Sequence, residues 1–423
     1  MTDSRTMVDA IFANQATWLA RLATGTPLPP TAADQHPTLW HDPWLAAART
    51  GRSGVILTPD ANTEVPTASL DATLDWLARH GTQDVLIWSP TPNPMMHPRL
   101  LARGAIDSFE PHWMWRDLTT VPPPPTLSSR FTIHEATLDD LPEILAHRGI
   151  PYVDDQQLRA MLSVAAASTR GEVTILIARE HSVLRRPRVI GLAAVNLIAT
   201  FEGIVGGLFN LGVHPSARGR GVGTALTAAI LAIAREHGAI GLGLNATPDG
   251  ERIYVKLGFR PIGRGQTWLL PAARLRYRPD PEIVLQVEAL ARDDRAALSP
   301  TIARIGLLPN GEMPVVFAAR FGHRELVRWL VTHGAQADIV AFWKVGLRDE
   351  AIALMHEERY VNRIAGPQAT TPLHDAIALG DATLARHLIA SGADLDARDS
   401  QHHGTPLDWA RALQRDDIAD LLR

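Results

Sequence analysis

The apolar positions change from strand spacing to helix spacing near the centre of the chain. Residues 208–213 form a short apolar run, and beyond a turn Val222, Leu226, Ile230 and Ile233 recur along one face of a helix. The pattern therefore predicts a strand, a turn and an amphipathic helix in direct succession.

Further strands and helices are predicted on both sides of this unit. Residues 131–137 alternate as a half-buried strand does, and a helix is expected to follow over 138–145. Apolar runs at 173–178 and 189–196 are typical of central strands, and another strand with its loop is expected over 242–250. Strands and helices therefore alternate through this part of the chain.

The turn at Arg218–Thr224 is suited to bind a diphosphate. Its three alternate glycines have no Cβ atoms and leave backbone N–H groups accessible at the positive end of the following helix. Arg218 and Arg220 add positive charge. A P-loop would need a lysine before Thr224, and a dinucleotide-binding turn would need its first glycine directly after the strand.

What remains is Arg-x-x-Gly-x-Gly after a strand that ends in Val-His-Pro, and this resembles the coenzyme A loop of the GNAT superfamily of N-acetyltransferases. Residues 251–259 resemble the short helix and the Tyr-x-x-x-Gly-Phe ending of the same family, and the run from Asn245 is similar to a bacterial subgroup. The resemblance covers residues 130–272. It implies an α/β (α+β) fold with a mixed central sheet flanked by helices, and acetyl-CoA as the cofactor.

The resemblance also implies roles for single residues. Tyr254 is expected to be the general acid, although an aromatic that only fills the helix–sheet interface is the alternative. Glu202 is the nearest acid that could serve as base, with His134 and Glu135 as further candidates, so the base stays unassigned. Asn210 can position substrate or water but cannot accept a proton. Cofactor contacts are expected from a bulged strand, the turn and the following loop: Leu211, Gly212, Val213, Arg218, Gly219, Arg220, Gly221, Val222, Gly223, Thr224, Asn245 and Thr247.

Residues 1–120 contain a fainter copy of the same order of elements. The segments 74–81, 85–89 and 100–104 resemble 233–238, 241–245 and 255–258 of the same chain. We therefore expect a degenerate, GNAT-like first half in tandem with the catalytic one, with 113–118 as its last strand. Its counterpart of the coenzyme loop, near 61–66, has no glycine and contains a glutamate, so it is not expected to bind coenzyme A.

Seven of the eleven tryptophans lie in this first half. One interpretation makes residues 36–44, together with Trp113 and Trp115, a wall of the acceptor pocket for an apolar or aromatic ligand. The other places these tryptophans in an ordinary core. The histidines of this half show no repeated ligand spacing, so no metal site is expected.

Two proline-rich linkers are expected, at 121–129 and at 273–282. Residues 283–423 then repeat: Thr371-Pro-Leu-His returns as Thr405-Pro-Leu-Asp after 34 residues (405 − 371). This resembles ankyrin repeats and implies an all-α solenoid, with 283–305 as its N-terminal cap. Such a stack either binds a protein partner or serves as a scaffold that packs on the transferase.

Composition narrows the function classes. The chain has 423 residues and a net charge of −4, which gives no long-range attraction to nucleic acid or to an acidic membrane. The absence of cysteine excludes disulfides and a cysteine nucleophile. No apolar run approaches the ~18 residues of a membrane span, so a cytoplasmic protein is expected.

These inferences predict an acetyl-CoA-dependent N-acetyltransferase that modifies a primary amine of a small molecule, such as an antibiotic, a toxin or a metabolite. One alternative is a protein acetyltransferase, acting on lysine or the N-terminus, that the ankyrin repeats recruit to its target. Another is a non-catalytic ankyrin scaffold with a vestigial coenzyme site. The sequence leaves open the acceptor, the use of longer acyl-CoAs and the oligomeric state.

Overall fold

The computed structural model describes residues 3–26, 38–50, 52–60, 63–120, 128–146, 149–151, 155–181, 187–366, 369–400 and 403–423. The first expected linker (121–127), His36 and the start of the degenerate loop (61–62) lie outside these residues. The chain forms two compact units, of which the first comprises residues 1–94 and 107–276 and the second 95–106 and 277–423. Both GNAT-like halves therefore contribute to the first unit.

The larger sheet of the first unit has seven strands in the order β12-β6-β11-β10-β9-β8-β7. The strands are β6 (His112–Asp117), β7 (Phe131–Glu135), β8 (Val173–Glu180), β9 (Arg188–Thr200), β10 (Gly203–Val213), β11 (Ala239–Ala246) and β12 (Arg260–Arg264). The neighbours β10 and β11 are parallel, and the other pairs are antiparallel. This is the mixed central sheet that the resemblance implied.

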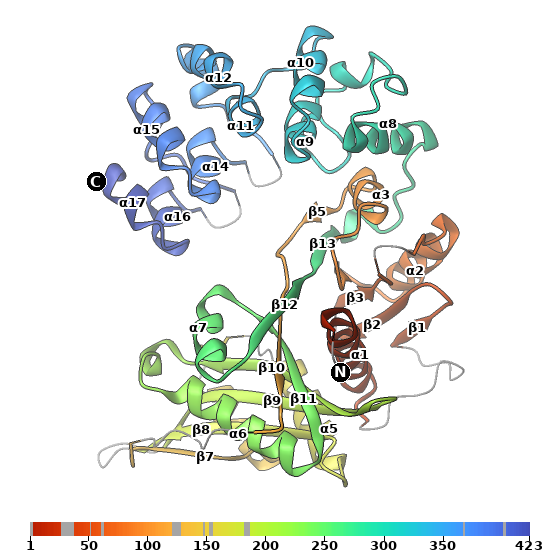
Figure 1. Ribbon diagram of the computed structural model, residues 1–423, viewed down its shortest axis with the longest axis vertical. Helices are drawn as coiled ribbons and strands as arrows, with labels where there is room; N and C mark the ends of the chain where they lie inside the picture. Colours follow the sequence, from red (N-terminus) through yellow and green to blue (C-terminus); the bar gives the residue numbers. More distant parts are fainter. Residues whose placement is uncertain are drawn as a thin grey trace. The chain divides into compact units, whose positions relative to one another are not determined.

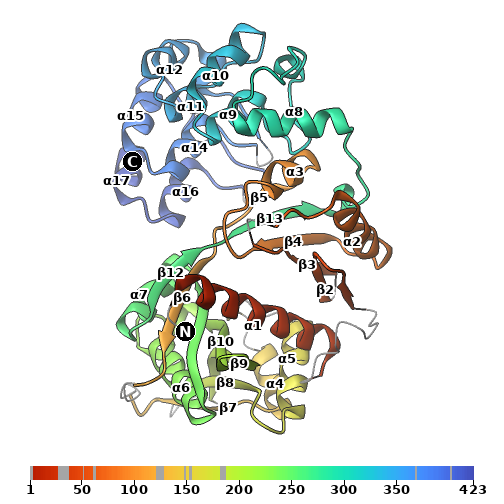
Figure 2. The ribbon, with the colours of Figure 1, turned by 45° about the vertical axis from the view of Figure 1, so that its right-hand side comes forward.

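Helices cover both faces of this sheet (Figure 2). On one face, α6 (Val222–Glu236) and α7 (Pro248–Lys256) bury Leu226, Ile230 and Tyr254 against the strands. The other face carries α4 (Leu141–Ala146), α5 (Asp155–Ala167) and α1 (Ser4–Thr24), the helix nearest the N-terminus. Glycines in β11 make room for α1 and for β6, because a Cβ atom at Gly243 would overlap Ile11 and one at Gly241 would overlap Trp115.

The two halves exchange one strand each. Strand β6, from the first half, lies between β11 and β12 of the second half. In return, β13 (Gln266–Pro271) of the second half pairs with β4 (Asp84–Ser89) of the first. Our expectation that 113–118 completes the sheet of the first half was therefore wrong, since strand order along the chain does not reveal which sheet a strand joins.

The smaller sheet has six strands in the order β1-β2-β3-β4-β13-β5. Besides β4 and β13, its strands are β1 (Leu39–His41), β2 (Ala46–Thr50), β3 (Ser53–Leu57) and β5 (Ile106–Asp107). The parallel strands β3 and β4 are linked by α2 (Thr67–Arg79), as β10 and β11 are linked by α6. The first half therefore repeats the strand–helix–strand order of the second half, as the sequence predicted.

The second unit is helical (Figure 1). Its first part is α3 (Met96–Ala102) packed against α8 (Pro281–Arg292), where Arg99 Nε donates to Glu288 Oε1 at 3.1 Å. Four helix pairs follow: α9 (Pro314–Arg320) with α10 (Arg324–Thr332), α11 (Ile339–Lys344) with α12 (Arg348–Met355), α14 (Pro372–Leu379) with α15 (Ala382–Ala390), and α16 (Pro406–Ala412) with α17 (Asp416–Ala419). A short helix, α13 (Glu358–Val361), precedes the third pair.

Threonine and proline start the later repeats as the sequence predicted. Thr405 Oγ1 accepts a hydrogen bond from the backbone of Asp408 at 3.3 Å, and proline occupies the first helical position after it. The Thr371 hydroxyl lies 2.9 Å from His374 Nδ1, while His374 Nε2 lies 3.2 Å from the Gly404 carbonyl of the next repeat. This buried imidazole therefore ties neighbouring repeats together. Within the described ranges, no helix is long and apolar enough to cross a membrane.

Candidate functional site

The parallel strands β10 and β11 separate part of the way along their length. Their last paired residues are Gly207 and Gly243, yet β10 continues to Val213 and β11 to Ala246. The strands of the first half behave differently, because β3 stays paired with β4 up to its last residue, Leu57, whose partner Trp88 lies one residue before the end of β4. The larger sheet therefore contains an opening between two parallel strands that the smaller sheet lacks.

A β-bulge lies on the edge of this opening. Phe209 pairs with Ala194 and Gly212 with Leu192, so Asn210 and Leu211 together face a single residue of β9. Asn210 has a φ of 51°, in the left-handed region, as a bulged residue can have. Residues 205–208 are buried, whereas 209–211 are partly exposed. The bulge expected near residues 211–213 is thus present, beginning one residue earlier.

The glycine-rich turn leads from β10 into α6 with unpartnered amides at the helix start. Gly219 and Gly221 have φ values of 73° and 83°, which favour glycine. Gly221 is the N-cap of α6, and no side chain caps this end. The first helical bond runs from the Ala225 N–H to the Gly221 carbonyl, so the three N–H groups before it have no partner within the helix. This arrangement suits an anion such as a diphosphate.

Gly223 and the two arginines of the turn have further contacts. A Cβ atom at Gly223 would lie 3.1 Å from Ile253 Cδ1, so this glycine lets α7 approach α6 closely. Arg218 Nε donates to the Val213 carbonyl at 3.3 Å, and Arg220 forms an ion pair with Glu180 at 3.2 Å. The arginines thus brace the turn, and the charge of Arg220 is shared with a carboxylate.

The residues at the end of β11 and in α7 lie close to one another. Thr247 is the N-cap of α7, where its hydroxyl accepts from the Gly250 N–H at 3.2 Å. Tyr254 lies one helical turn beyond Gly250. Its side chain is only 5% exposed and packs edge-on against Phe259, with 5.7 Å between the ring centroids. This position agrees with both roles considered for Tyr254, the general acid and the interface aromatic.

A histidine of the first half reaches the same place through the exchanged strand. His112 pairs with Ala246 in the β6–β11 ladder, and its backbone N–H donates to Asn245 Oδ1 at 2.9 Å. His112 Nδ1 lies 3.4 Å from Glu251 Oε2, and Glu251 stands one helical turn before Tyr254. A titratable pair therefore lies beside the end of β11. No local pattern indicates this pair, because its members are far apart in the chain.

Several expected site residues lie elsewhere. Glu202 is in the turn before β10, eight residues before the bulge at Asn210, which corresponds to roughly 25 Å along an extended strand. His134 and Glu135 lie on the edge strand β7, where His134 contacts Arg179. None of these three can act as base at the opening.

Trp113 and Trp115 are also core residues. They are 1% and 0% exposed, and they pack with α1 on one face of β6. Neither side chain is accessible to a substrate, so neither can form a wall of the acceptor pocket. For these two tryptophans, the ordinary-core interpretation holds.

Helix α1 covers the sheet beside the opening. Asn14, fully buried, donates to the carbonyls of Asn196 and Val205, both at 3.0 Å, and Trp18 stacks on Phe209 with 5.1 Å between ring centroids. Phe209 directly precedes the bulge. The N-terminal helix therefore forms part of the surroundings of the opening, a role that its sequence pattern did not indicate.

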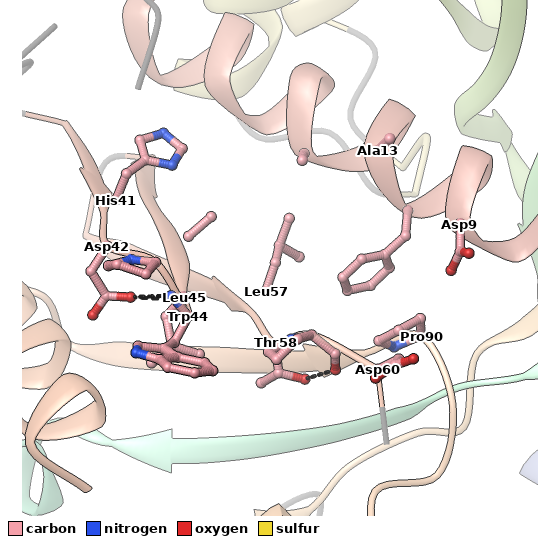
Figure 3. A pocket seen from close by; sticks show the side chains of 15 residues that line it. Asp9, Ala13, His41, Asp42, Trp44, Leu45, Leu57, Thr58, Asp60 and Pro90 are labelled. Atoms are coloured by element: carbon pink, nitrogen blue, oxygen red, sulfur yellow. Dashed lines mark hydrogen bonds between the residues drawn. The ribbon is translucent and has the colours of Figure 1, made fainter. Parts of the chain in front are cut away.

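A separate pocket of about 410 Å³ lies on the opposite side of α1 (Figure 3). It is lined by Asp9, Phe12 and Ala13 of α1 and by residues of the smaller sheet, including His41 and Trp44. Trp44 is 40% exposed. Because the neighbouring positions Ile11 and Asn14 face the larger sheet, this pocket is separated from the opening by the helix itself. The described part of segment 36–44 thus lines a pocket, but not one beside the bulge.

The arrangement places the acid–base groups His112 and Glu251 beside the end of β11. Among the residues that the structure describes, no group of three or more His, Asp or Glu side chains is placed to hold a metal ion. Parallel strands that separate at a bulge, next to a helix start without a side-chain cap, leave an opening lined by backbone amides that suits an anionic ligand.

Comparisons with known proteins identify the domain that contains this opening. Residues 138–259 match the model of the acetyltransferase (GNAT) family, and residues 287–399 match the model of ankyrin repeats in three copies. The chain therefore contains a GNAT acetyltransferase domain and C-terminal ankyrin repeats. A search of the curated proteins found no match.

Solved structures with similar folds include three relatives of low identity. A GCN5-related N-acetyltransferase from Kribbella flavida is 17% identical, with 55% of this chain and 89% of that chain covered and a TM-score of 0.42. Another from Sphaerobacter thermophilus is 16% identical, with 54% and 76% covered and a TM-score of 0.40. A tandem GNAT protein from the clavulanic acid biosynthesis pathway is 16% identical, with 62% and 95% covered and a TM-score of 0.39.

Proposed function

We propose that the protein is an acetyl-CoA-dependent N-acetyltransferase that acts on a primary amine of a small molecule. The observation that carries this proposal is the opening between β10 and β11, which leads to the uncapped start of α6. Its backbone amides and the cradle at Gly219, where an added Cβ would meet no atom within 4 Å, suit the diphosphate of the coenzyme. When bound, acetyl-CoA supplies an activated acyl group as a thioester.

Tyr254 is the proposed general acid. It lies on α7 next to the end of β11, where its phenol can donate a proton to the leaving thiolate. Burial keeps water away from this proton transfer. Thr247 and Asn245 keep α7 and β6 in place around it, because each forms a hydrogen bond at the end of β11.

His112 is the proposed general base. It lies at the same height along the sheet as the bulge. The last pair between β10 and β11 is Gly207 with Gly243; three residues further, β10 reaches Asn210 and β11 reaches Ala246, whose partner on β6 is His112. The imidazole can accept the proton that the attacking amine loses, and Glu251 at 3.4 Å stabilises the resulting imidazolium. His112 would thus take up the proton that the amine loses, and Tyr254 would donate its phenol proton to the departing sulfur, so that two residues handle the two proton transfers.

A small acceptor is favoured by the way α1 covers the sheet. The helix is fixed by the buried Asn14 and places Trp18 against Phe209 beside the bulge. Trp18 is itself buried, but the partly exposed Phe209 that it holds in place offers an apolar surface beside the bulge, which suits a compact amine with an apolar body. We further propose that the first half binds no coenzyme, since β3 stays paired with β4 over its whole length and the Thr58 N–H also donates to the Trp88 carbonyl at 2.8 Å.

The ankyrin repeats support a second candidate, in which they recruit a protein whose lysine or N-terminal amine is acetylated. Two assays distinguish the candidates. One measures turnover of acetyl-CoA with a panel of small primary amines, and the other measures it with a protein lysate from which small molecules have been removed. We expect release of coenzyme A with at least one class of small amine. Acetylation of proteins with no turnover of any small amine would favour the second candidate, and release with neither would support a non-catalytic scaffold.

A further inference from the structure

Three arginines surround one buried glutamate beside the glycine-rich turn. Glu180, at the end of β8, accepts from Arg188 Nε at 2.8 Å and forms ion pairs with Arg130 at 2.7 Å and Arg220 at 3.2 Å. We call Arg130, Arg188 and Arg220 the arginine cluster. They come from the start of β7, the start of β9 and the turn itself, so the fold, and not one local motif, brings them together.

The cluster has more positive charge than its carboxylate can balance. One negative charge faces three positive charges, which leaves a surplus of two. Burial by itself would raise the pKa of Glu180, but the hydrogen bond from Arg188 and the three guanidinium charges outweigh it and lower this pKa. The glutamate is 3% exposed, whereas the arginine side chains are 34–53% exposed, so the surplus faces solvent.

The cluster borders the turn but is distinct from the amides at the start of α6. Arg220 is a residue of the turn, and the Arg188 guanidinium lies 3.4 Å from Ser216 Oγ at the turn's beginning. An anion that contacts Arg188 and Arg130 would therefore lie next to a diphosphate held by the turn. Guanidinium groups that share one carboxylate repel one another, and a second anion relieves this repulsion.

We propose that the arginine cluster is a subsite for a phosphate monoester, and that it binds the 3′-phosphate of coenzyme A. This inference rests on the proposed function, because it assumes that the diphosphate occupies the turn. A phosphate monoester has a charge of about −1.5 to −2 at neutral pH, which matches the surplus of the cluster. The diphosphate has its own partners in the helix amides, so each anionic group of the coenzyme meets a separate positive site.

The test compares coenzyme A with 3′-dephospho-coenzyme A by calorimetric titration. The full-length protein is expected to bind coenzyme A about tenfold more tightly or better, as loss of a charge-assisted contact implies. Arg188→Gln should lower the affinity for coenzyme A about tenfold and leave that for the dephospho form within about twofold. Arg130→Gln should act in the same direction, and it disturbs the buried glutamate less because its side chain is more exposed.

Arg235→Gln is the matched control, since this exposed arginine lies at the opposite end of α6. Inorganic phosphate should compete more strongly with coenzyme A than with the dephospho form, because only coenzyme A occupies the arginine cluster as well as the turn. The inference is overturned if both arginine variants bind the two coenzymes with an unchanged ratio. If the wild-type protein binds neither coenzyme, the proposed function itself fails, and the two failures are thereby distinguished.

Discussion

His112 and Ala246 lie opposite each other in the ladder between β6 and β11. Through this pairing, the first half of the chain contributes a histidine to the end of the strand that borders the opening of the second half. The tandem arrangement is therefore more than a duplication, because the proposed active site is assembled from both halves.

The role of His112 can be tested by His112→Gln. Removing a general base typically costs a factor of 10² to 10⁴, so we expect kcat to fall about 100-fold or more while the KM for acetyl-CoA changes little. Glu251→Gln removes the carboxylate that lies 3.4 Å from His112 Nδ1, so we expect kcat to fall by about tenfold, less than in His112→Gln.

His41→Gln provides the control for this experiment, since His41 lies in the separate pocket beyond α1. Added imidazole should restore part of the activity of His112→Ala. A His112→Gln enzyme with wild-type kcat and an unchanged pH profile would contradict the assignment.

The buried amide of Asn14 is predicted to stabilise the first unit. Its side chain bonds the Asn196 and Val205 carbonyls and accepts from Asn196 Nδ2 at 2.9 Å. Asn14→Ala leaves these groups unsatisfied, so we expect the free energy of unfolding to fall by about 2–4 kcal/mol. Urea denaturation measures the change, and Thr17→Ala on the exposed face of α1 should alter it by less than about 0.5 kcal/mol. Equal effects of the two substitutions would show that the network contributes little.

The ankyrin unit contains an acidic side chain whose ionisation opposes folding. Burial, with some contribution from Asp338, raises the pKa of Asp375 to about 6. The folded protein therefore holds a proton that the unfolded chain has released, and this contribution to stability is lost as the pH rises through 6. Asp375→Asn cannot ionise, so it should be more stable than wild type at pH 8 by roughly 1–2 kcal/mol and similar near pH 4.

Thermal unfolding at the two pH values checks this prediction. The exposed Asp417→Asn serves as control and should track the wild-type protein at both. A difference between Asp375→Asn and wild type that does not change with pH would contradict the expected ionisation.

The parts of the site that are contiguous in sequence could be predicted. The strand, turn and helix over 208–236 and the α7 segment with Tyr254 are read from local spacing, because a glycine turn and an amphipathic helix depend on nearby residues. The ankyrin helices follow for the same reason, since each repeat has its own starting threonine or proline.

The parts assembled from distant segments could not be predicted. Nothing in the local pattern of β6 or β13 indicates which sheet each joins, so their exchange was missed, and the sequence alone could not decide between a pocket wall and the core for Trp113. Glu202 was one candidate for the base, because it is the nearest acid before the strand that leads to the turn. A strand is extended, however, so the eight residues between Glu202 and Asn210 place Glu202 at the opposite end of β10 from the bulge. His112 and Glu251 meet only in the folded chain.

The central claim is that the coenzyme binds at the turn before α6, and calorimetric titration of acetyl-CoA tests it most directly. Gly219→Glu introduces bulk and negative charge at a position with a φ of 73° and no neighbouring atom within 4 Å of an added Cβ. Gly238→Glu is a matched control, with a φ of 78° and the same open surroundings at the other end of α6. We predict micromolar binding to the wild-type protein and to Gly238→Glu, and a loss of about 100-fold or more in Gly219→Glu. Equal binding by the two variants, or no binding to the wild-type protein, would contradict the account.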